Sequence, residues 1–162
     1  MHRKSLTGFT TIELLAVIVV MSILAVAAIP RLEILPEFEK TGLHDKLSAG
    51  LQYARKTAIS SRRAVCVATS NGNAGKVSLT IDATPPETST GVCSLNLIPP
   101  IPDKTDGCAA NQICAGSRLS ITANVTSFQF GAFGRLSPAS AVSFAVPGEA
   151  NISIDAETGY VH

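Results

Sequence analysis

Four kinds of residue in this 162-residue chain could take part in chemistry or binding: a lone carboxylate in an apolar stretch, four cysteines, three histidines and a group of basic residues. The carboxylate belongs to Glu13, the one charged residue between Phe9 and Ile29. A carboxylate within an apolar membrane helix costs about 2.5 to 3.5 kcal/mol to insert and is seldom kept without a use. Glu13 is therefore expected to have a function of its own.

The cysteines all follow the apolar stretch, and their even number in an exported domain favours disulfides. They are Cys66, Cys93, Cys108 and Cys114. Four cysteines allow three pairings, of which local closure favours Cys108 with Cys114 and Cys66 with Cys93. A zinc site would need closely spaced CxxC-like pairs, which the sequence lacks. We expect structural disulfides and neither a metal nor a cofactor.

No catalytic group emerges from the remaining polar residues. His2, His44 and His162 are scattered, so no serine or cysteine has an obvious general base, and we expect no enzyme. Asp103 and Asp106 lie near Gly107, but calcium needs a longer series of spaced oxygen ligands. This pattern indicates a solvated turn.

A basic group stands near the end of a predicted helix and consists of Arg55, Lys56, Arg62 and Arg63. Positive charge is favourable at a helix C-terminus, so the group needs no ligand to explain it. The whole chain has 13 Lys and Arg against 12 Asp and Glu, a net charge of +1. Bulk charge therefore gives no case for a nucleic-acid partner.

The element that would position Glu13 is an apolar helix over residues 9–30. His2, Arg3 and Lys4 precede it, and about twenty apolar residues suffice to cross a bilayer. The basic residues would hold that end in the cytoplasm. A conventional signal peptide cleaved near Ala25-Val26-Ala27 and a plain membrane anchor are alternatives, but Glu13 is awkward for both.

Residues 31–63 change to an amphipathic helical pattern, with one apolar stripe formed by Leu43, Leu47, Leu51, Ala54 and Ala58. Proline removes a backbone donor, so we expect a kink or short interruption near Glu33 to Pro36. Together the two segments form a predicted helix from Phe9 to about Ser60. Its second half is expected to carry the rest of the chain.

Residues 64–162 read as strands and turns. A hairpin is predicted from residues 64–68 and 76–81 around Asn71-Gly72-Asn73, and residues 85–106 read as a long loop with one short strand near 95–98. Later strands are predicted at 119–121, 127–130, 142–146 and 152–154, closed by Gly159-Tyr160-Val161. We predict an α+β fold, with the long helix packed on a small antiparallel β-rich head.

The string Gly8-Phe9-Thr10-Thr11-Ile12-Glu13-Leu14-Leu15 resembles the class III leader junction of type IV prepilins and type II secretion pseudopilins. The resemblance implies that residues 1–8 are a leader, that prepilin peptidase cuts between Gly8 and Phe9, and that Phe9 is then N-methylated. It also implies a docking role for Glu13, through the amino group of Phe9 on a neighbouring subunit. Thr11 departs mildly from the family, which more often has Leu or Val there.

The head resembles the GspH/FimT family of minor pilins and pseudopilins. The similarity lies in residues 51–59, in Phe130-Gly131-Ala132-Phe133-Gly134-Arg135, in 152–155 and in the closing Gly159-Tyr160-Val161. It implies a pilin fold and a low-copy subunit of a type II secretion pseudopilus or type IV pilus. The cysteine-bearing head and the ending Glu157-Thr158-Gly159-Tyr160-Val161-His162 also resemble minor pilins of the mannose-sensitive haemagglutinin type.

The same resemblance implies partners and a location. The chain would be a single-pass protein of the bacterial inner membrane, with a cytoplasmic N-terminus and a periplasmic head, later incorporated in a filament. Its partners would be prepilin peptidase, other pilins or pseudopilins and the inner-membrane assembly platform.

Two other functions stay open. Some FimT-like subunits bind DNA during natural transformation, but they carry a further arginine after the closing glycine, where this chain ends Gly159-Tyr160-Val161-His162. The other alternative is an exported disulfide-bonded domain with a conventional signal peptide.

Overall fold

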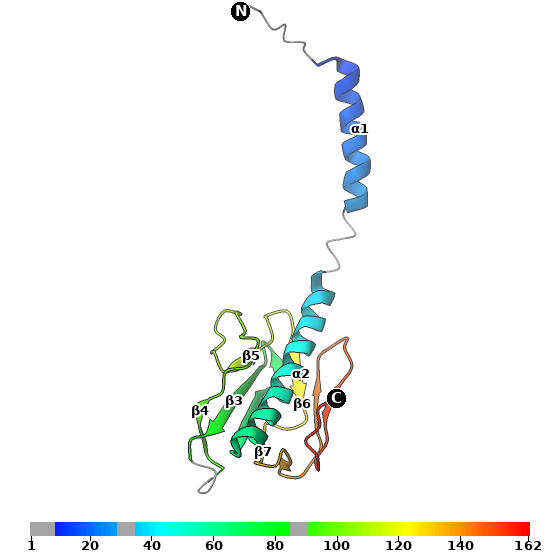
Figure 1. The fold of residues 1–162 in the computed structure, drawn as a ribbon. Coiled ribbons are helices and arrows are strands. Elements are labelled where there is room, and N and C mark those ends of the chain that lie inside the picture. Colours follow the sequence, from blue (N-terminus) through cyan, green and yellow to red (C-terminus); the bar gives the residue numbers. More distant parts are fainter. Residues whose placement is uncertain (1–8, 29–34, 85–90) are drawn as a thin grey trace, which may run out of the picture. The chain divides into compact units, whose positions relative to one another are not determined.

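The computed structural model describes residues 9–28, 35–84 and 91–162. They divide into two compact units, Met1–Phe38 and Glu39–His162. The described residues form two helices followed by ten strands (Figure 1).

Helix α1 spans Thr11–Ala28, and its side chains are exposed from Thr11 to Ala25. Among the described residues, no helix meets the length and apolarity needed to cross a membrane. The predicted span of residues 9–30 ends in Ile29 and Pro30, which lie outside the described residues.

Helix α2 spans Leu35–Ser61 and supplies the predicted apolar stripe. Pro36 lies in its first turn, where a missing N–H costs no intrahelical hydrogen bond. The helix ends before Arg62, whose φ of 52° is left-handed. Of the region Glu33 to Pro36, where a kink or short interruption was predicted, Glu33 lies outside the described residues and Pro36 is helical.

The larger sheet has six strands in the order β4-β3-β1-β7-β8, with β5 also paired to β3. Its strands are β1 Val65–Ser70, β3 Lys76–Asp82, β4 Cys93–Asn96, β5 Gln112–Cys114, β7 Ser127–Phe130 and β8 Leu136–Ser137. All pairings in it are antiparallel. The predicted hairpin is confirmed, because Ser70 pairs with Lys76 and Val65 with Ile81.

The smaller sheet has four strands in the order β10-β9-β6-β2. Its strands are β2 Gly72–Asn73, β6 Ser120–Ala123, β9 Val142–Ala145 and β10 Ile152–Ile154. Residue Asn73 comes from the turn of the predicted hairpin and pairs with Ser120, so that turn joins the two sheets. The last residues also pair, since Val161 bridges Ile154.

One core lies between α2 and the sheets, as expected for an α+β head (Figure 1). The stripe of α2 is buried throughout, from Leu43 at 4% exposure to Ala58 at 0%. The strands contribute alternate residues, and Phe128 packs edge-to-face against Phe130 and Phe144. The α+β fold class with a helix on antiparallel strands is therefore confirmed.

Candidate assembly site and head surface

The predicted docking segment begins just ahead of α1. Gly8 lies outside the described residues, whereas Phe9 is described, non-helical and 79% exposed. Thr10 precedes the helix and caps it. The backbone N–H of Glu13 donates to the Thr10 carbonyl oxygen at 3.1 Å and lies 3.3 Å from the Thr10 hydroxyl.

Residues Thr10 to Glu13 match a capping box, in which Ser or Thr caps the helix and Glu or Gln stands three positions later. The charge of Glu13 in the first turn suits the positive end of the helix dipole. Of the capping box, the structure contains the hydrogen bond from the Glu13 N–H to the Thr10 hydroxyl, so Thr10 acts as the N-cap. Sequence reasoning missed this role, although the T-x-x-E pattern could have revealed it.

The site combines an exposed Phe9 with an exposed carboxylate about one helical turn away. If the chain begins at Phe9, one subunit carries both an amino group and a carboxylate. Such a pair is self-complementary between neighbours, because each subunit then offers a cation to one neighbour and an anion to another.

Three segments that are distant in sequence meet at the C-terminal end of α2. Arg55 donates from Nε to the Thr158 carbonyl oxygen at 3.0 Å. A Cβ at Gly134 would lie 2.8 Å from Ile59 Cδ1 of α2, and one at Gly159 would overlap the Gly134 carbonyl oxygen. The segments named in the resemblance therefore form one packed junction, which we call the closing junction: Arg55, Ile59, Gly134, Thr158 and Gly159.

The turn of the closing junction is organised by Asp155. Its Oδ1 accepts from the N–H groups of Thr158 at 2.8 Å and Glu157 at 3.1 Å, and from the Thr158 hydroxyl at 2.8 Å. The Thr158 hydrogen bonds lower the pKa of the Asp155 carboxyl. Past this turn, Tyr160 stacks on His162 with ring centroids 5.7 Å apart. The closing segment is thus a turn held by hydrogen bonds to Asp155 and followed by two stacked rings.

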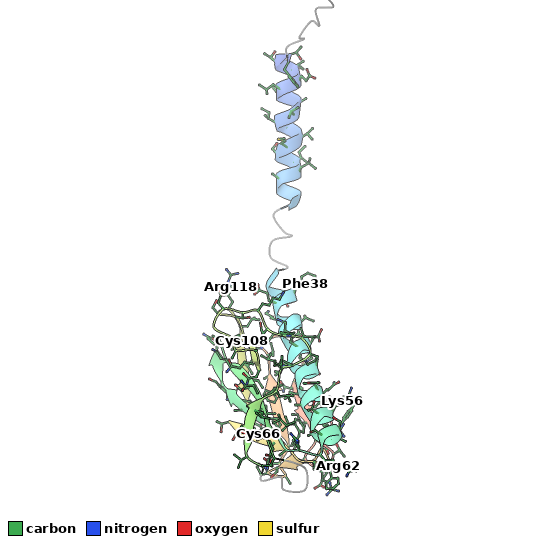
Figure 2. All side chains as sticks on the ribbon, turned by 60° about the vertical axis from the view of Figure 1, so that its left-hand side comes forward. Phe38, Lys56, Arg62, Cys66, Cys108 and Arg118 are labelled. Atoms are coloured by element: carbon green, nitrogen blue, oxygen red, sulfur yellow. A yellow bond between two sulfur atoms is a disulfide. The ribbon has the colours of Figure 1, made fainter. Side chains whose placement is uncertain are left out.

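The basic residues do not act as one free group. Arg55 is half-buried and holds Thr158, whereas Lys56 and Arg62 are exposed near the same end of α2 (Figure 2). His44 lies 3.5 Å from Asp45 on α2, far along the chain from His162. His162 belongs to the closing segment, where its backbone exchanges two hydrogen bonds with Ser153.

The cysteines form the two bonds that local closure favours, Cys66–Cys93 and Cys108–Cys114. The described residues include no free cysteine. They also include no group of three or more His, Cys, Asp or Glu side chains arranged to hold a metal ion.

The expectation of a solvated turn at Asp103 and Asp106 is wrong for Asp103. Its side chain is 2% exposed and lies 3.7 Å from Lys46 of α2. Burial alone would raise the pKa of this carboxyl, but hydrogen bonds from Thr105 and Cys114, aided by the Lys46 charge, lower it below the ordinary 3.8. Asp103 therefore fastens its loop, and Asp106 stays exposed.

Comparison with known proteins identifies this architecture. The family model described as type II transport protein GspH matches residues 44–158. The chain belongs to the GspH family. The match covers α2 from His44 onward and nearly all of the head, including every residue of the closing junction except Gly159.

Solved structures show the same fold. Two crystal forms of the type IV minor pilin FimU of Pseudomonas aeruginosa align at TM-scores of 0.50 and 0.52, with 22% and 23% identity. The alignments cover 75% and 78% of this GspH-family chain and 90% and 89% of FimU. No curated protein matches the chain in sequence. At this identity the FimU likeness establishes the pilin fold.

Proposed function

We propose that this GspH-family chain is a minor pilin or pseudopilin, a structural and assembly subunit of a type II secretion pseudopilus or type IV pilus. The observation that carries the proposal is the combination of a GspH head with a preceding apolar helix that bears Glu13 in its first turn. Family and fold are those of structural subunits, and the role does not require a catalytic group.

Processing follows from the leader pattern. Prepilin peptidase cuts between Gly8 and Phe9, and the new amino group of Phe9 is methylated. The apolar residues 9–30 remain attached after this cut and anchor the chain in the inner membrane, with the head in the periplasm. Support comes from the basic residues ahead of the apolar stretch and from its apolar sequence.

Docking uses the carboxylate of Glu13 and the amino group of Phe9 on a neighbouring pilin, delivered by the inner-membrane assembly platform. A buried ion pair of this kind fixes register more than it adds stability. Glutamine is a better matched replacement than alanine, because Gln suits the third position of a capping box as Glu does.

The test separates docking from capping with matched variants of the full chain in the native host. Glu13→Gln keeps a side chain that fits a capping box but removes the charge, and Thr10→Ala removes the cap but keeps the charge. We expect both variants to be cleaved and methylated at Phe9. Glu13→Gln should lower recovery in sheared filaments by about tenfold or more, the loss expected for a docking ion pair, and Thr10→Ala by less.

Two readouts complete the experiment. Mass spectrometry of the mature N-terminus should give a methylated Phe9; a start at Ala28 would instead mean a conventional signal peptide. Carbonate extraction of membranes should leave the chain in the pellet. Normal filament recovery of Glu13→Gln would exclude docking by charge.

A further inference from the structure

The outer edge of β3 is covered by two short strands instead of one long one. On its other side β3 pairs with β1 along its length. On the outer side β5 pairs at Lys76–Ser78 and β4 at Thr80–Asp82. Strands of three and four residues supply few ladder hydrogen bonds, and an uncovered edge is a template for pairing with other chains.

Each covering strand has its own disulfide. Cys93 of β4 is bonded to Cys66 of β1, and Cys114 of β5 is bonded to Cys108 in the segment that leads into it. In Figure 2 the labelled Cys108 lies nearer the Phe38 end of α2 and Cys66 nearer the Lys56 end. The two bonds therefore act at different halves of the edge.

Each covering strand also has its own buried aspartate. The carboxylate of Asp82, which is 0% exposed, accepts the N–H of Gly91 at 2.8 Å, two residues before Cys93. Asp103 accepts the N–H of Cys114 at 3.1 Å. Each covering strand is thus held by a disulfide and by a hydrogen bond to a buried carboxylate, and the two attachments lie within two residues of each other.

The covering strands complete the core as well as the edge. Leu97 follows β4 and is 8% exposed, and Ile113 of β5 is 1% exposed. Ile113 sits so close to α2 that a Cβ at Gly50 would overlap its Cδ1 atom. Loss of either strand would open apolar surface together with unpaired backbone groups.

We propose that each disulfide fastens one half of the cover over β3, so that the sheet edge closes only after oxidation. Cys108–Cys114 controls β5, and Cys66–Cys93 controls β4. Each closure converts two thiols to one S–S bond, and the two protons and two electrons pass to a disulfide-form thiol oxidant, which becomes a dithiol. The dithiol head keeps its helix and central strands but has an open edge.

Amide hydrogen exchange on the full chain in detergent tests the proposal, with three backbone hydrogen bonds at this edge as reporters. Leu79 N–H donates to Asn111 and Ala115 N–H to Gly75, which report on the β5 half. Leu97 N–H donates to the Leu79 carbonyl and reports on the β4 half. Thr69 N–H, which donates to Thr126 away from this edge, is the reference.

The two serine variants serve as each other's control. Cys108→Ser with Cys114→Ser should speed exchange at Leu79 and Ala115 by about tenfold or more and leave Leu97 within about threefold. Cys66→Ser with Cys93→Ser should do the reverse. Unchanged exchange at the matching reporters overturns the proposal, and so does an equal rise at Thr69, because the bonds would then hold the whole head.

Stepwise reduction of the oxidised wild-type chain provides a second measurement that does not depend on folding of the variants. Thiols are trapped by alkylation as each bond opens, and exchange is read on the species with one bond left. The proposal requires the same half-specific pattern. Exchange that rises at all three reporters in either single-bond species contradicts it.

Discussion

At the scale of single residues, two carboxylates show how position decides the role of the same chemical group. Glu13 is exposed at the start of α1, where a charge is available to another molecule. Asp103 is buried and has its partners within its own chain. A buried carboxylate is tolerated only where hydrogen bonds or charges replace water, which identifies Asp103 as a structural fastener.

The lowered pKa of Asp103 predicts a pH-dependent contribution to head stability. A carboxyl whose pKa falls on folding stabilises the native state above its unfolded value, near 3.8, and this contribution disappears as the pH drops through the folded value. Asp103→Asn should therefore lower the free energy of unfolding by about 1.5 to 3 kcal/mol at pH 7. Urea unfolding at pH 7 and pH 3 measures the difference.

Asp106→Asn is the matched control, because Asp106 is on the same loop and exposed. It should change the free energy of unfolding little at either pH. The gap between wild type and Asp103→Asn should shrink at pH 3. A gap of equal size at both pH values would show that the lost contacts are not those of the charged carboxylate.

Which of these roles could be predicted from sequence depends on how local their partners are. The pairing of Cys108 with Cys114 follows from their separation of only 6 residues in the sequence, and the cap at Thr10 is indicated by the pattern of the four residues Thr10 to Glu13. Asp103 gave no such signal. Its partners Lys46 and Cys114 come from α2 and β5, and only the folded chain brings them together.

At the scale of elements, the long periodic segments and some short strands, such as β7 and β10, were predicted, whereas β5 and β8 were not. The α2 stripe and the β1–β3 hairpin repeat a period over many residues. β5 and β8, with three and two residues, are too short to display alternation. They form because a neighbouring strand offers hydrogen bonds, β3 in one case and β7 in the other.

The closing junction yields the prediction at this scale. Gly159 has φ of +63°, and a Cβ there would meet the Gly134 carbonyl, which belongs to backbone and cannot move aside freely. Gly159→Ala should therefore lower the free energy of unfolding by more than about 2 kcal/mol, since both the φ penalty and the overlap must be relieved. Chemical unfolding of the full chain measures it.

Gly107→Ala separates the two causes. Gly107 has a similar φ of +77°, but a Cβ there would meet nothing within 4 Å. It should cost only the left-handed backbone penalty of about 1 to 2 kcal/mol. Equal losses for the two variants would mean that the approach of the two backbones contributes nothing.

At the scale of the whole molecule, the two compact units carry different kinds of sequence signal. The family match at residues 44–158 lies within the unit Glu39–His162, whereas the predicted leader and docking residues lie within Met1–Phe38. The leader and docking residues of Met1–Phe38 were predicted from one short motif. The family of the head was predicted from the order of several weak motifs, because the closing junction links segments from both ends of the head.

The division predicts that residues 39–162 fold without the rest of the chain. The core of this unit is made of its own residues, from Leu43 to Val161. We expect the fragment, oxidised in the periplasm, to unfold cooperatively, with a midpoint within about 5 °C of the head transition in the full chain. Circular dichroism against temperature gives both values.

A shorter fragment supplies the contrast that makes this prediction decisive. A chain starting at Ala54 lacks Leu43, Leu47 and Leu51, which are 4%, 0% and 0% exposed. Each such side chain contributes about 2 to 5 kcal/mol, and their sum reaches the whole stability of a small domain, about 5 to 15 kcal/mol. This fragment should show no cooperative transition. If it unfolds like the longer one, α2 is dispensable and the sheets alone hold the head; if both fail, the head depends on residues before Glu39.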